Sequence, residues 1–157
     1  MNQVSLRDAA PEDIAAFIAL QRDPIASHMA AFTAADPDDE AQARKKWRDI
    51  LEDEKIYAQA VVLSHAVVGN ALSFVVEDTV EVSYWIDRRY WGHGVATTAL
   101  GLLLARVTLR PLRARTAVDN VRSQAVLRRN GFAHVGDDCG FANARGGYTD
   151  EYIFELN

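Results

Sequence analysis

The chain has 157 residues, of which 49% are hydrophobic and 25% charged, a balance typical of a single globular domain. No apolar run approaches the roughly 18 residues of a membrane span. Residues 1–13 lack the apolar core of a signal peptide, so we expect a cytoplasmic protein without membrane contact. The single cysteine, Cys139, excludes an internal disulfide framework and a cysteine-rich metal site.

The net charge of −5 conceals an uneven distribution of charged residues. Between Arg88 and Asn130 there are nine arginines and one acidic residue, Asp119, so this stretch carries +8 and the rest of the chain −13. Such a separation is compatible with an anionic ligand near the positive stretch. A solvated arginine-rich helix surface explains it as well, and charge alone favours that simpler explanation.

The first half of the chain is predicted from the periodicity of its apolar residues, which is two in strands and about 3.6 in helices. This gives a strand at 4–9, a helix from Pro11 to 21, an irregular segment at 21–35 and a helix at about 37–53. Three strands follow at 56–63, 66–76 and 79–86, the first two joined by a hairpin turn at Ser64-His65.

The second half alternates helices and strands. A helix is expected from Gly94 to about Val107, a strand at 112–118 and a helix at 120–130. Two final strands, FAHVGD and YTDEYIFEL, flank a polar stretch at 138–147. This order predicts an α/β domain with a mixed sheet, because strict strand–helix alternation is missing.

The junction at 87–100 leads from a strand to a buried helix through Gly92 and Gly94. The first amides of a helix have no partner within the helix, and they coincide with the positive end of its dipole. Glycine lets a phosphate approach the backbone, because no Cβ intervenes. With Arg88, Arg89 and His93 beside it, the junction is interpreted as a pyrophosphate cradle; a turn with glycines for geometry alone is an equal alternative.

Two other phosphate-binding motifs are disfavoured at this junction. A P-loop would have lysine and serine or threonine after its last glycine, but Val95 and Ala96 follow Gly94. A dinucleotide-binding fingerprint would have a third glycine where Thr97 stands, and it usually lies near the start of a domain.

Two motifs in the expected order carry a family resemblance. Arg89-x-x-Gly92-x-Gly94-x-Ala96, which follows the strand at 79–86, resembles the acetyl-CoA signature of the GNAT superfamily of N-acetyltransferases. Asn120-x-x-Ser123-x-x-x-Leu127-x-x-x-Gly131-Phe132 resembles its second motif. The residues of these two motifs are most similar to those of the branch that acetylates ribosomal-protein N-termini (RimJ/RimL-like). The resemblance implies one N-acetyltransferase domain over residues 1–157, with a mostly antiparallel sheet of six to seven strands, about four helices and a splayed central strand pair.

The resemblance also implies acetyl-CoA as the acyl donor, without a metal. In the family, amides at the start of the central helix hold the pyrophosphate, and the pantetheine arm lies along the end of the preceding strand. The positive stretch between Arg88 and Asn130 would then attract the phosphates of the coenzyme. The residues implied in coenzyme binding are Trp85, Ile86, Arg89, Trp91, Gly92, His93, Gly94, Val95, Ala96, Thr97, Asn120 and Ser123.

Catalysis requires a neutral amine, although α-amines have a pKa near 8 and lysine near 10.4, so a general base should help. Glu81 is the candidate, because similar glutamates serve as base in some family members; pairing with an arginine or exposure to solvent is the alternative. Many family members have an acidic tyrosine where this chain has Arg128. Ser123 is therefore the nearest candidate acid, with a purely structural hydroxyl as the alternative.

The expected function is an acetyl-CoA-dependent N-acyltransferase that acetylates a primary amine, on a protein N-terminus or a small molecule, by direct attack in a ternary complex. A nucleotide-dependent oxidoreductase is disfavoured by Thr97. The alternative is a non-catalytic acyl-CoA sensor or partner-binding module. It gains some support from Arg128, which stands where many family members have the acidic tyrosine. The scattered histidines predict no metal site. We expect no nucleic-acid partner, and a homodimer only by family likeness.

Overall fold

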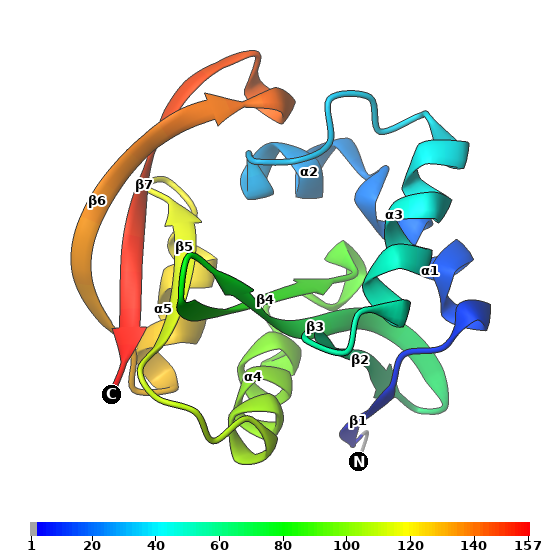
Figure 1. The fold of residues 1–157 in the computed structure, drawn as a ribbon, viewed down its shortest axis with the longest axis horizontal. Coiled ribbons are helices and arrows are strands. Elements are labelled where there is room, and N and C mark those ends of the chain that lie inside the picture. Colours follow the sequence, from blue (N-terminus) through cyan, green and yellow to red (C-terminus); the bar gives the residue numbers. More distant parts are fainter. Residues whose placement is uncertain (1–2) are drawn as a thin grey trace.

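The computed structural model describes residues 3–157, which form a seven-stranded sheet with helices on both faces (Figure 1). The strands are β1 (Val4–Asp8), β2 (Tyr57–Leu63), β3 (Ala66–Val76), β4 (Thr79–Ile86), β5 (Leu112–Ala117), β6 (Ala133–Ala142) and β7 (Gly147–Leu156). The α-helices are α1 (Ile14–Gln21), α2 (Pro24–Ala30), α3 (Glu40–Glu52), α4 (Val95–Arg106) and α5 (Val121–Arg129). Single 3-10 turns lie at Pro11–Asp13, Arg88–Tyr90 and Asn143–Arg145.

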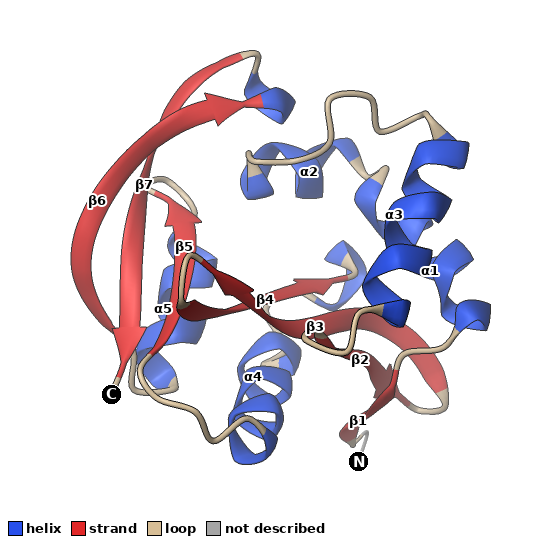
Figure 2. Ribbon diagram, in the orientation of Figure 1, coloured by secondary structure: helices blue, strands red, loops and turns tan. Residues whose placement is uncertain are grey.

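The helices divide between the two faces of the sheet (Figure 2). On one face, α4 inserts Ala99, Leu100 and Leu103, all fully buried, into the main core. On the other face, α1 and α3 enclose a second core in which the rings of Phe17 and Trp47 lie 4.7 Å apart. The layers follow from the periodicity of the apolar residues, because each helix buries its apolar side against the sheet.

The sheet follows the order β1-β2-β3-β4-β5-β7-β6, and within the described chain β4 and β5 form its single parallel pair. These two strands pair at two positions, Val80 with Leu112 and Glu81 with Arg113. Beyond Glu81 the strands carry no further ladder partners and diverge. The predicted mixed, mostly antiparallel sheet with a splayed central pair is confirmed.

The segment 21–35, expected to be irregular, contains α2. Asp23 caps this helix, since its side chain accepts hydrogen bonds from the amides of Ile25 and Ala26. Pro24 stands at the first helical position, where its fixed φ suits the helix. The sequence of α2 is short and lacks helical periodicity. Only the capping residue Asp23 and Pro24 indicated a helix there.

The final hairpin is longer than expected. Residues 138–147 were predicted as a polar connection, but most of them extend β6 and β7, with Asp138 opposite Glu151 and Ala142 opposite Gly147. The extension brings Ala142 into a small buried cluster with Ala31 and Ala117. Pairing with β7, rather than local hydrophobicity, keeps these polar residues in strand form.

Asp13 provides a test of the acid stability of the fold. Arg7 donates two hydrogen bonds of 2.7 and 2.8 Å to its carboxylate, and this contact lowers the pKa of Asp13 below its ordinary value. A lowered pKa in the folded state stabilises the fold above the unfolded-state pKa, and the stabilisation disappears as pH falls. We expect Asp13→Asn to lower the free energy of unfolding at neutral pH by about 1–3 kcal/mol and to flatten its acid dependence, measured by urea denaturation from pH 7 to 3.

Asp49→Asn is the matched control for Asp13→Asn. Asp49 forms an exposed pair with Lys45, and such pairs contribute about 0–1 kcal/mol. Equal losses of stability in the two variants would contradict the role assigned to Asp13.

Candidate functional site

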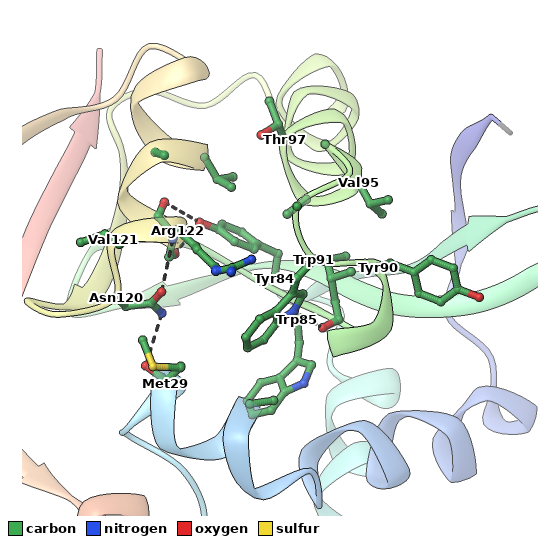
Figure 3. A pocket seen from close by; sticks show the side chains of 18 of the residues that line it. Met29, Tyr84, Trp85, Tyr90, Trp91, Val95, Thr97, Asn120, Val121 and Arg122 are labelled. Carbon is green, nitrogen blue, oxygen red and sulfur yellow. Dashed lines mark hydrogen bonds between the residues drawn. The ribbon is translucent and has the colours of Figure 1, made fainter. Parts of the chain in front are cut away.

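A cavity of about 480 Å³ opens where β4 and β5 diverge (Figure 3). Its walls come from the end of β4, the loop that leads into α4, the start of α5 and one side of α2. Ten of the twelve residues expected to contact the coenzyme line it: Trp85, Ile86, Trp91, Gly92, Gly94, Val95, Ala96, Thr97, Asn120 and Ser123.

The glycines at the start of α4 shape the floor of this cavity. Gly92 and Gly94 have φ values of 80° and 77°, in the left-handed region that favours glycine. A Cβ placed on Gly94 would meet nothing within 4 Å, so the backbone faces open space there. Because the first amides of α4 have no helical acceptor, the loop offers donors to an anion. This geometry fits the pyrophosphate of a coenzyme.

Trp91 holds the glycine loop against the strand. Its indole Nε1 donates a 2.9 Å hydrogen bond to the carbonyl of Ile86 (Figure 3). The guanidinium of Arg122 lies 5.6 Å from the Trp91 ring centroid, and its Nη1 is the nearest atom to a Cβ built on Gly92, at 3.9 Å. Trp91 thus connects the cradle with a positive charge from α5.

The structure assigns the basic side chains differently from the sequence. Arg89 is 80% exposed and binds Asp87 at 2.7 Å, and neither Arg89 nor His93 lines the cavity. Of the nine arginines between Arg88 and Asn130, all of which are described, two line it, Arg122 and Arg129. Sequence reasoning did not single out these two, although their spacing of seven places them on one face of α5.

Arg122 should strengthen coenzyme binding through its charge. We expect Arg122→Ala to weaken acetyl-CoA affinity about tenfold, and to reduce its salt dependence, because a charge-assisted contact to phosphate is lost. Isothermal calorimetry at two salt concentrations measures both effects. Arg128→Ala is the control, since Arg128 lies on the same helix but its guanidinium is 5.3 Å from the ring centroid of Phe154, outside the cavity. Equal losses in both variants would contradict the assignment.

Asn120 connects the start of α5 to α2. Its side-chain oxygen accepts from the Ser123 amide at 3.3 Å, and its nitrogen donates to the Met29 carbonyl at 3.3 Å (Figure 3). Asn120 therefore caps α5 and fixes the wall that carries Ser123.

Tyr84, near the end of β4, lines the cavity and contacts Ser123 of α5. Its hydroxyl oxygen lies 2.6 Å from Ser123 Oγ and 3.1 Å from the Ser123 carbonyl oxygen, so its one proton has two acceptors within reach (Figure 3). Burial raises the pKa of Tyr84 to about 12. When the phenol donates to Oγ, the shorter of the two contacts, the Ser123 proton is free for transfer. The alternation of residues along β4 does not predict this contact between Tyr84 and Ser123, which are 39 positions apart in the chain.

Glu81 lies at the apex of the splay, at the last position where β4 pairs with β5. It is 7% exposed, and its Oε1 is 3.6 Å from Nε of Arg115, while Glu81 itself does not line the cavity. Arg115 also binds Asp138 and Glu151, each at 2.9 Å, and burial raises the pKa of Glu151. The alternative of an arginine partner, open at the level of the sequence, is present in the structure.

Within 3–157, no group of three or more histidine, cysteine, aspartate or glutamate side chains could hold a metal ion. In the same part of the chain, no helix is long and apolar enough to cross a membrane.

Residues 3–133 match the acetyltransferase (GNAT) domain family, and the chain belongs to that family. No curated protein matches the chain. Among solved structures, a protein provisionally assigned as a phosphinothricin N-acetyltransferase is 25% identical, with a TM-score of 0.80 over 99% of this chain and 98% of its own.

Two further solved structures contain the coenzyme. Spermidine N-acetyltransferase from Vibrio cholerae, in complex with CoA and spermine, is 16% identical, with a TM-score of 0.84 over 98% of this chain and 95% of its own. RimL, a ribosomal L7/L12 α-N-protein acetyltransferase in complex with coenzyme A, is 20% identical, with a TM-score of 0.79 over 98% and 93%. These likenesses confirm the fold, and with the family match they agree with acetyl-CoA as the donor.

Proposed function

We propose that the chain is an N-acetyltransferase that transfers the acetyl group of acetyl-CoA to a primary amine by direct attack in a ternary complex. The observation that carries the proposal is the glycine cradle at the start of α4, which opens into the cavity between the diverging strands. When bound there, acetyl-CoA supplies an acetyl thioester. The amides of 94–97, with Arg122 and Arg129, would hold its phosphates.

The transfer needs one bond to form and one to break. The amine nitrogen bonds to the thioester carbon, the carbon–sulfur bond breaks, the nitrogen loses a proton and the sulfur gains one. Ser123 is proposed to give its hydroxyl proton to the leaving sulfur. Tyr84, 2.6 Å away, supports this step by donating to Ser123 Oγ.

Glu81 is proposed as the general base, acting directly or through water. Its support is its burial and its place at the last position where β4 pairs with β5, where the two strands begin to diverge. We expect Glu81→Gln to lower kcat/KM at pH 7 by about 10²-fold.

Glu155→Gln is the control for Glu81→Gln, because Glu155 also pairs with an arginine of β5, Arg113, at 2.9 Å. An unchanged kcat/KM in Glu81→Gln would remove Glu81 from the mechanism. Equal losses of kcat/KM in both variants would show that breaking an ion pair with an arginine of β5, and not removing a general base, causes the effect.

The similar structures are named for three different acceptors: phosphinothricin, spermidine and a ribosomal protein N-terminus. Likeness alone therefore does not select the acceptor. The test is a panel of amines, amino acids and peptides with acetyl-CoA, with mass detection of acetylated product and of free thiol. Acceleration of thiol release by an acceptor supports the proposal. Coenzyme binding that no acceptor converts into thiol release would favour an acyl-CoA sensor.

A further inference from the structure

A second cavity, of about 490 Å³, lies between α3 and the β3–β4 part of the sheet. It shares Tyr84 and Trp85 with the coenzyme cavity, so the two meet along the end of β4. We propose that this cavity binds the acceptor and that the acceptor is a free α-amino acid with an apolar side chain. The inference rests on the proposed function and deepens it.

The walls of the second cavity are mostly apolar and aromatic. They include Trp47, Ile50, Ile56, Leu72 and Phe74, from α3, the segment that follows it and β3. A volume near 490 Å³ lies in the usual range for small-molecule sites. The walls would stabilise an aliphatic or aromatic side chain by removing it from water.

Two donors in this apolar lining have no acceptor. Nδ2 of Asn70 and Nε1 of Trp85 are buried without a hydrogen-bond partner among the described residues. Asn70 and Trp85 are register partners on β3 and β4, so their side chains are neighbours on one face of the sheet. An unpaired buried donor costs about 1–3 kcal/mol, which a ligand oxygen would offset.

Both nitrogens are covered from solvent, so binding of the ligand requires the side chains around them to move. A carboxylate offers two acceptor oxygens, one for each donor. In an α-amino acid a single carbon separates the carboxylate from the amine. Capture of the carboxylate at Trp85 therefore places the amine at the wall shared with the coenzyme cavity.

The charges at the rim favour a carboxylate over a polyamine. Among the described residues that line this cavity, Lys46 and Lys55 are the cations and Asp53 is the one carboxylate. The Asp53 side chain already accepts from the Lys55 amide at 2.9 Å. A polycationic acceptor would meet repulsion here, whereas an anionic one is attracted.

The first experiment compares L-phenylalanine with an analogue that lacks its carboxylate, a dipeptide that displaces the carboxylate, and a polyamine. Thiol release from acetyl-CoA is measured with L-phenylalanine, 2-phenylethylamine, phenylalanyl-alanine and spermidine. We expect kcat/KM for L-phenylalanine to exceed each of the others at least tenfold. Equal or better use of 2-phenylethylamine or spermidine would overturn the inference and leave the proposed function intact. Equal use of the dipeptide would replace the free amino acid by a protein N-terminus. Failure of acetyl-CoA to bind would overturn both.

The second experiment tests the donors without relying on turnover. L-phenylalanine should produce a saturable change in tryptophan fluorescence, because Trp47 and Trp85 line the cavity. Asn70→Leu should weaken this binding at least tenfold while its Tm stays at or above that of the parent, since an unpaired polar group is replaced by an apolar one of similar size. Unchanged binding in Asn70→Leu, or a lower Tm with binding retained, would contradict the role of Asn70.

Lys46 and Lys45 provide a matched pair for the rim charge. Lys46 lines the cavity, whereas its neighbour Lys45 pairs with Asp49 and does not. Lys46→Glu should raise KM for L-phenylalanine several-fold, and Lys45→Glu should leave it unchanged. Equal effects in the two variants would contradict the proposed attraction.

Discussion

Replacing Gly94 with aspartate is expected to reduce acetyl-CoA affinity at least a hundredfold. Gly94 has φ 77° and caps α4, and its missing Cβ leaves open space in front of the first helical amides. A carboxylate attached there would occupy the anion site itself and repel the coenzyme phosphates. Calorimetric titration with acetyl-CoA measures the effect.

Gly146→Asp separates the anion site from backbone strain. Gly146 has φ 65°, and a Cβ there also meets nothing within 4 Å, but it lies in the β6–β7 connection. Both substitutions should lower the free energy of unfolding by about 1–2 kcal/mol, because left-handed backbone disfavours a side chain. Only Gly94→Asp should lose coenzyme affinity. Tight acetyl-CoA binding by Gly94→Asp would contradict the cradle.

The second large effect is expected at the Ser123–Tyr84 pair. Ser123→Ala should lower kcat by about 10²-fold or more, since the leaving sulfur loses its proton donor. Tyr84→Phe should lower kcat about tenfold, because the phenol polarises the serine rather than reaching the sulfur itself. The acetyl-CoA dissociation constant should change little in either variant. Stopped-flow thiol release and calorimetry measure the two quantities separately.

A double-mutant cycle tests whether the two hydroxyls act together. If Tyr84 acts through Ser123, Tyr84→Phe should have no further effect once Ser123 is alanine. Because burial raises the pKa of Tyr84 to about 12, the phenol keeps its proton across the assay range, and no loss of rate should follow its ionisation below pH 10. Full turnover in Ser123→Ala would assign the serine a purely structural role.

Local spacing was sufficient to predict two groups of residues that line the cavity, the glycine junction before α4 and the start of α5. Gly92 and Gly94 stand at a strand-to-helix junction, and Asn120 and Ser123 occupy neighbouring positions of one helix face, so short-range geometry determines both groups. The boundaries of β3 and β4 were predicted for the same reason, since alternating residues formed a clear period of two.

Tertiary contacts account for what the sequence did not disclose. α2 is held by the distant hairpin, since Arg145 Nε donates to the His28 carbonyl at 2.9 Å. The selection of Arg122 over Arg89 depends on which acids are near, and Asp87 occupies Arg89. The contact between Tyr84 and Ser123 spans 39 positions of the chain, beyond any local pattern.

The distribution of charge along the sequence likewise does not show which charged side chains pair in the fold. The positive stretch resembles a single anion-binding surface in the sequence, yet Arg113 and Arg115 are engaged by acidic residues of the final hairpin. Two arginines on one face of α5, Arg122 and Arg129, line the cavity. Net charge by segment does not distinguish the arginines that pair with acidic residues from those that face the cavity.

Hydrogen–deuterium exchange with and without acetyl-CoA tests most directly where the donor binds. Saturating acetyl-CoA should slow exchange at the amides of 94–97 and at the end of β4, residues 85–86, while the outer strands β1 and β2 exchange as before. No protection at the start of α4, or protection confined to other parts of the chain, would contradict the placement of the coenzyme between β4 and β5.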